Sequence, residues 1–78
     1  MGFEIVISAE EAIAKARQVL NNMGLSLHFL FEVIPGREEL HDVWYVRAHT
    51  AVGALEVVID RSKGEVLAVR RLVKKVEA

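Results

Sequence analysis

The fold of this chain is decided by residues 43–73, VWYVRAHTAVGALEVVIDRSKGEVLAVRRLV, in which apolar runs alternate with short glycine-containing breaks. Runs of Val, Ile, Leu and aromatic residues bounded by such breaks are typical of β-hairpins. We therefore predict three consecutive antiparallel strands, with turns at residues 52–53 and 61–64. Gly64 is expected to adopt the positive φ that closes the second turn.

Alternation with a period of two divides the side chains of this sheet between two faces. The side chains predicted to face the core are Trp44, Val46, Ala48, Leu55, Val57 and Ile59. The opposite face is predicted to carry Val43, Tyr45, Arg47, His49, Glu56 and Val58. The last strand is apolar on both faces, with Val66 and Ala68 on one and Leu67 and Val69 on the other. Its register stays open, because a slip of one residue exchanges these two sets.

A further long strand is predicted at residues 25–34, where apolar residues again alternate. Its core side would consist of Leu25, Leu27, Phe29, Phe31 and Val33. Its other side would carry Ser26, His28, Leu30, Glu32 and Ile34. Pro35 and Gly36 are expected to end this strand, and the polar residues 37–42 are expected to form a loop.

One amphipathic helix is predicted ahead of these strands. Ser8 is suited to cap its N-terminus, and Glu11 lies three residues later, where its carboxylate can accept a hydrogen bond from the Ser8 backbone amide. Apolar residues then recur at steps of three and four, and Gly24 supplies a left-handed C-cap. We therefore predict a helix over residues 9–23. Residues 3–7 form either a short edge strand or an extended segment that packs against the helix.

The composition indicates one small domain without a strong overall charge. The chain has 78 residues, 53% of them hydrophobic, and 10 basic against 11 acidic residues give a net charge of −1. This balance argues against nucleic-acid binding, which usually needs a basic excess. The chain has no cysteine, no apolar run of the roughly 18 residues that span a membrane, and no signal-peptide pattern. We therefore predict a single domain over residues 1–78 in the cytoplasm, with an excised domain of an exported protein as the alternative.

These elements together predict an α+β fold in which one helix packs on one face of an antiparallel sheet of about four strands. Nothing in the sequence covers the second face, and its apolar residues are too many for a solvated surface. A homodimer or another protein partner is the economical explanation. The residues predicted to form this partner face are His28, Leu30, Glu32, Ile34, Tyr45, Arg47, His49 and Val58.

Two stretches of the chain resemble a PepSY domain. Residues 7–16, ISAEEAIAKA, match the opening helix of that family with its Ser cap. Residues 44–46, WYV, and residues 55–67, LEVVIDRSKGEVL, match its hairpin, with residues 62–64 in place of the family's Thr-Gly turn. The resemblance implies a cystatin-like two-layer fold and a non-catalytic module, for which a role in restraining peptidases has been proposed. The chain departs from the family in its lack of an export signal and of an attached peptidase, and residues 35–42 have no place in the family pattern.

The histidines of this sequence could form a metal site, or they could be surface residues of the sheet without a ligand. In one register of the first hairpin, His28 would lie opposite His49, within range of one ion. In the register shifted by two residues, Glu32 would instead lie opposite Arg47 as an ion pair. No third ligand is present in either case, because His41 lies in the predicted loop. We therefore predict no metal and no cofactor, with His28 and His49 as weak metal candidates.

No catalytic set can be assembled from the sequence. Glu10 and Glu11 diverge by about 100° around the helix and are explained by capping. Trp44 and Phe29 belong to the predicted core and cannot stack on nucleic-acid bases. We therefore predict a non-enzymatic protein-interaction or regulatory module, such as one that restrains a peptidase, acting through the uncovered sheet face. A small-molecule or metal-binding protein is the alternative.

Overall fold

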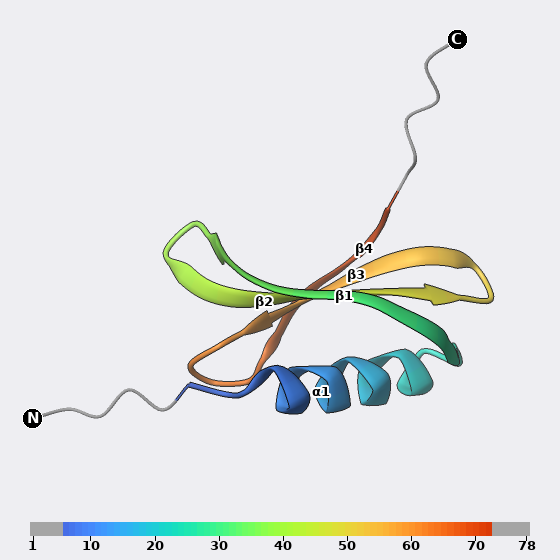
Figure 1. Cartoon of the computed structure of the whole chain (residues 1–78), viewed down its shortest axis with the longest axis horizontal. Helices are drawn as coiled ribbons and strands as arrows, with labels where there is room; N and C mark the ends of the chain where they lie inside the picture. Colours follow the sequence, from blue (N-terminus) through green and yellow to red (C-terminus); the bar gives the residue numbers. More distant parts are fainter. Residues whose placement is uncertain (1–5, 73–78) are drawn as a thin grey trace, which may run out of the picture.

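The computed structural model describes residues 6–72, except for the side chain of Phe31, whose predicted place in the core lies outside this description. The elements are α1 (Ala9–Asn22), β1 (Leu27–Glu38), β2 (His41–Thr50), β3 (Gly53–Asp60) and β4 (Val66–Arg71). The strands form one antiparallel sheet in the order β1-β2-β3-β4. Helix α1 lies along one face of this twisted sheet (Figure 1). The predicted α+β fold is confirmed.

Helix α1 begins where the sequence predicts. The Ser8 hydroxyl accepts a hydrogen bond from the Glu11 backbone amide (3.1 Å), and the Glu11 carboxylate accepts one from the Ser8 backbone amide (3.4 Å). This capping box satisfies two amides that the helix itself leaves without partners. The helix packs against the sheet through Ala12, Ala16 and Leu20, which are fully buried. Within residues 6–72, no helix is long and apolar enough to cross a membrane.

The core lies between α1 and the sheet. Its buried strand residues include four of those predicted: Val46, Leu55, Val57 and Ile59. Trp44 packs against this core, and its indole Nε1 donates a hydrogen bond to the Ile7 carbonyl (2.9 Å). The Ile7 amide in turn donates to the Arg61 carbonyl (2.7 Å). The segment predicted at residues 3–7 lies largely outside the described residues, and Ile7 itself packs against the core without belonging to a strand.

Strand β1 is longer than the sequence predicts. Pro35 and Gly36 do not end it, because the strand continues to Glu38 and a two-residue turn leads into β2 at His41. An edge strand tolerates proline, since the missing amide can face away from the neighbouring strand. The prediction of a loop over residues 37–42 was therefore wrong.

Two register shifts in the β1–β2 pairing change which side chains face the core. They lie between Leu27 and Phe29 and between Leu30 and Glu32. In each shift an extra residue of β1 interrupts the alternation, as in a β-bulge. Leu27, Leu30 and Val33 therefore pack against the core, whereas Phe29 is 59% exposed. The core position predicted for Phe29 and the partner-face position predicted for Leu30 were both wrong for this reason.

The register of β4, which the sequence leaves open, is set by a similar shift. The pairing with β3 shifts near the start of β4, where Leu67 has no partner in the ladder. Val66 and Val69 consequently both pack against the core, and Ala68 faces the opposite side. Neither of the two predicted sets is therefore found. Gly64 has the predicted positive φ, 73°, whereas the β2–β3 turn falls at residues 51–52, one residue earlier than predicted.

The sheet face that points away from α1 is hereafter the concave face. The side chains at its centre are those of Tyr45, Arg47, Glu56, Val58 and Arg70. Val43 and Val58, which the sequence predicts to be exposed on this face, are fully buried. The prediction that these apolar side chains need a partner to cover them was therefore wrong.

One ion pair shows how strongly this face is curved. Glu38 in β1 pairs with Arg70 in β4, although these strands form opposite edges of the sheet. The strand pairings place Arg70 in one row across the sheet with Glu56, Arg47 and Glu32. Glu38 lies six residues farther along β1 than Glu32, the member of this row in β1. A flat sheet would separate the two charges by roughly 20 Å along the strand direction alone. The twist therefore brings the β1–β2 turn over the concave face, and Figure 1 shows this end of the hairpin bending away from α1.

Candidate binding site on the concave face

A series of ion pairs crosses the centre of the concave face. Arg47 Nε donates to one carboxylate oxygen of Glu56 (2.9 Å), and Arg70 Nη1 donates to the other (3.4 Å). Arg47 also pairs with Glu32. The Glu56 side chain is only 7% exposed, so its carboxylate is a buried charge held by two guanidinium groups. The hydrogen bond to Glu56 outweighs desolvation and raises the pKa of Arg47.

The same series continues to the rim of the face. Arg70 pairs with Glu38, and the second carboxylate oxygen of Glu38 accepts a hydrogen bond from the Tyr45 hydroxyl (2.7 Å). The bond from Arg70, followed by that from Tyr45, lowers the pKa of Glu38. The bond to the Glu38 carboxylate raises the pKa of Tyr45. Because Arg70 joins Glu38 to Glu56, one connected network runs from Glu32 to Tyr45.

Asp60 closes the β3–β4 turn at one end of this face. Its Oδ1 accepts hydrogen bonds from the backbone amides of Ser62 (2.8 Å) and Lys63 (3.2 Å), and its Oδ2 lies 3.2 Å from Nδ1 of His41. The Ser62 amide makes the largest contribution to lowering the pKa of Asp60.

We expect the variant Asp60→Asn to be less stable than the wild type near neutral pH and nearly as stable at low pH. Because the pKa of folded Asp60 lies below its unfolded value of about 3.9, the ionised group stabilises the fold above roughly pH 4. That contribution is lost as the pH falls through the folded pKa. The urea midpoints of the two proteins should therefore converge as the pH is lowered from 7 toward 2.5. A constant difference across this range would show that the charge of Asp60 has no part in stability.

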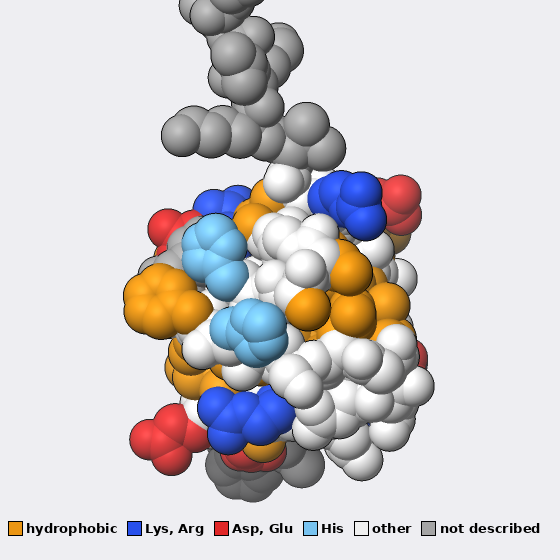
Figure 2. Space-filling model, turned by 90° about the vertical axis from the view of Figure 1, so that its right-hand side faces the viewer, with side chains coloured by type: hydrophobic (Ala, Val, Ile, Leu, Met, Phe, Trp, Pro, Cys, Tyr) orange, Lys and Arg blue, Asp and Glu red, His pale blue; other side chains and the backbone are white. Residues whose placement is uncertain are grey.

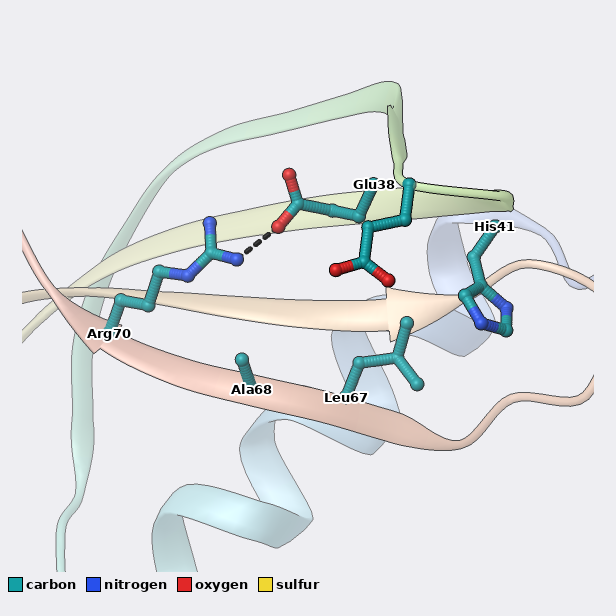
Figure 3. Close-up of a pocket in the computed structure, with 6 residues that line it drawn as sticks. Glu38, His41, Leu67, Ala68 and Arg70 are labelled. Atoms are coloured by element: carbon teal, nitrogen blue, oxygen red, sulfur yellow. Dashed lines mark hydrogen bonds and ion pairs between the residues drawn. The ribbon is translucent and has the colours of Figure 1, made fainter.

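A pocket of about 270 Å³ opens on the concave face between the β1–β2 turn and β4. The residues that line it are Glu38, Glu39, His41, Leu67, Ala68 and Arg70. In Figure 3, Leu67 and Ala68 project from β4, and Glu38 and His41 face them from across the pocket. Arg70 is turned toward Glu38. The pocket thus combines an apolar side, formed by β4, with a polar rim in which Glu38, His41 and Arg70 are held by ion pairs within the chain.

The structure brings together only part of the predicted partner face. The predicted residues that lie on the concave face and are partly accessible are Glu32, Ile34, Tyr45 and Arg47. Val58 also lies on this face, but it is fully buried and cannot contact a partner. Leu30 packs against the core on the opposite side.

Of the two predicted histidines, His49 lies on the same side of β2 as Arg47, but at the end of the sheet near the β2–β3 turn. His28 lies at this end as well, in the register shift between Leu27 and Phe29. The register is the one that pairs Glu32 with Arg47, so Phe29 rather than His28 lies opposite His49. The rings of Phe29 and His49 stack with centroids 6.1 Å apart and planes at 27°. Among residues 6–72, no group of three or more metal-ligating side chains could hold an ion.

Hydrophobic side chains are exposed at this same end. Met23, Phe29 and Val52 are the large ones. Figure 2 views this end and shows histidine side chains beside hydrophobic ones. The ion-pair network and the pocket lie at the centre of the concave face and beside the β1–β2 turn, which makes this part of the face the better-defined candidate site.

Three residues of the ion-pair network are absent from the predicted partner face: Glu38, Glu56 and Arg70. The predicted loop over residues 37–42 includes Glu38. One signal could have found Glu56, because a two-residue turn at residues 51–52 places it directly opposite Arg47. Opposite charges at facing positions of a hairpin favour that register.

Comparisons with protein-family models, with curated proteins and with solved structures find no match to this chain. Its function is therefore inferred from the residues of the concave face.

Proposed function

We propose that this chain is a non-catalytic protein-binding module that receives a segment of a partner protein on its concave face. The observation that carries the proposal is the pocket beside β4, of whose rim Glu38, His41 and Arg70 are already held by contacts within the chain. Arg70 is bonded to Glu38 and Glu56, and Glu38 is bonded to Tyr45, without any partner. Side chains that are ordered in advance lose little conformational entropy on binding, which favours association.

The lining of the pocket favours a protein over a small molecule. An apolar centre with a polar rim is the usual composition of a protein interface, and here β4 supplies the apolar side and the β1–β2 turn the polar rim. The pocket of about 270 Å³ has room for a side chain of a partner. A small-molecule ligand is the second candidate.

Two partner classes follow from the sequence. A second copy of the chain that binds on the concave face would contact the pocket and the exposed Leu67, because Val43 and Val58 are already buried. If the partner is a different protein, the resemblance to PepSY domains suggests a peptidase as the first one to test. Either partner would contact the same rim of Glu38, Glu39 and His41.

Selection from an unbiased phage-displayed peptide library, with the wild-type protein immobilised, tests the proposal. We expect selected peptides to lose at least tenfold in affinity for the variant Ala68→Phe, because the added ring occupies the pocket. A loss of about 1.4 kcal/mol corresponds to that factor. Light scattering on the same variant tests the second-copy alternative, since a dimer formed through the pocket would dissociate.

The matched control is Ala14→Phe, which adds the same ring to an exposed position of α1. This variant should bind the selected peptides as the wild type does. Melting curves of both variants establish that they are folded. If no peptide is selected, or if the selected peptides bind Ala68→Phe unchanged, the concave face is not the binding surface and the proposal is wrong.

A further inference from the structure

We propose that the partner segment is an extended strand that pairs with the outer edge of β4 and places a Lys or Arg side chain in the pocket. This inference rests on the protein-binding function proposed above and names the chemistry of the ligand. Addition of a strand to an exposed sheet edge is a common mode of peptide recognition, in which backbone hydrogen bonds give affinity and pockets for alternate side chains give specificity.

The two edges of the sheet differ in their fitness for such pairing. Strand β1 carries Pro35 and two register shifts, features that protect an edge from further pairing. Strand β4 has a continuous register from Ala68 to Arg71, and the Leu72 amide donates to the Ala54 carbonyl (2.9 Å). Because amides of successive residues point in opposite directions along a strand, the backbone groups of Val69 and Arg71 face outward. Among residues 6–72, no segment pairs with this edge.

The pocket lies directly beside the outer edge of β4. Leu67, Ala68 and Arg70, half of its lining, belong to this strand, and Leu67 is 39% exposed. Side chains of an added strand would alternate between the two sheet faces. Those on the concave side would lie next to Leu67 and Ala68, within reach of the pocket, so one edge-bound peptide could use both features.

The charges of the pocket select a cation. Arg70 pairs with Glu38 and Glu56, and Arg47 also pairs with Glu56, so the two arginines balance these two carboxylates. Within residues 6–72, the Glu39 carboxylate makes no ion pair, although its residue lines the pocket. The uncompensated charge at the pocket is therefore negative. Lys and Arg combine a cationic end with an aliphatic stem, and that stem can lie over Leu67 and Ala68.

The test is an NMR titration of the isotope-labelled full chain with capped seven-residue peptides that alternate valine and threonine around a central residue. Three peptides differ only at that centre, which is lysine, norleucine or glutamate. We expect the lysine peptide to shift the amide signals of Val69 and Arg71. It should bind about two- to fivefold more tightly than the norleucine peptide, as expected for one accessible ion pair. It should bind about tenfold more tightly than the glutamate peptide. Methylation of those peptide amides that face β4 should abolish the shifts, whereas methylation of the alternate amides should not.

Two variants separate the ion pair from the strand pairing. Glu39→Gln should remove the preference for lysine over norleucine. Glu10→Gln, which removes an exposed carboxylate from α1, should keep the preference. Equal affinities for the three peptides, or shifts confined to α1 or β1, would overturn the inference. If library peptides depend on Ala68 yet no peptide shifts the β4 amides, the proposed function stands and this inference fails. If no binding depends on Ala68, the proposed function fails as well.

Discussion

Replacement of Glu56 by alanine is expected to lower the free energy of unfolding by about 3–5 kcal/mol, the range measured when one partner of a buried ion pair is removed. The Glu56 carboxylate is 7% exposed and accepts hydrogen bonds from both Arg47 and Arg70. Its loss leaves two guanidinium groups close together with no carboxylate between them. Urea denaturation at pH 7 measures the change, and a chain of this size is expected to unfold in two states.

Two further variants show whether the loss arises from charge. Glu32→Gln removes the more accessible carboxylate that pairs with Arg47, and we expect a cost below about 1 kcal/mol because solvent screens that pair. The triple variant Glu56→Leu, Arg47→Met, Arg70→Met removes all the central charges together, and it should recover most of the stability lost in Glu56→Ala. Equal effects of Glu56→Ala and Glu32→Gln would contradict a buried network.

The parts of the fold that depend on local sequence could be predicted. The capping box of Ser8 and Glu11 and the helical spacing of Ala12, Ala16 and Leu20 act within a few residues of one another, and α1 lies where they place it. The strands are joined in sequence by short turns, so apolar runs and turn residues were enough to indicate the sheet. These signals do not require knowledge of distant contacts.

The faces of the edge strands could not be predicted in the same way. Alternation assigns faces correctly only while the ladder is unbroken, and no glycine or other local signal marks the shifts after Leu27 and Leu30. A bulge forms where the packing of both faces requires it, here so that Leu27, Leu30 and Val33 can all reach the core. The same applies to β4, where Val66 and Val69 share a face despite their odd spacing.

The candidate site was predicted only in part, because it depends on the coiling of the whole sheet. Glu38 and Arg70 are separated by 32 residues and meet only after the β1–β2 turn bends over the concave face. Counting apolar residues suggested that Val43 and Val58 needed a partner to cover them. In the folded chain these residues are covered within the chain itself, where charged and polar side chains extend across the same face. These two side chains therefore need no partner to shield them from solvent. The argument for a partner rests on the pocket instead.

Replacement of Gly36 by alanine is the second large effect that we expect, a loss of about 1–3 kcal/mol from overpacking. The ring of Tyr45 lies across Gly36, and an added methyl group would stand 2.9 Å from Cδ2 of that ring and closer still to Cε2. An aromatic ring laid over a glycine in an edge strand shields the backbone that the missing side chain leaves exposed. The backbone of Gly36 does not have a positive φ, so the steric overlap with Tyr45 is the reason for the cost.

The overlap should be visible at Tyr45 itself, because this residue is the single tyrosine of the chain. Its bond to Glu38 raises its pKa, so the wild-type phenol should ionise above its ordinary value of about 10. In Gly36→Ala the displaced ring loses that bond, and an ultraviolet titration should show the pKa falling back toward the ordinary value. In a Tyr45→Ala background the same Gly36→Ala change should cost less than about 0.5 kcal/mol, because the overlapping ring is gone. An unchanged titration of Tyr45 together with an additive double variant would mean that the ring does not rest on Gly36, and that the rim of the pocket is not held by the contact between them.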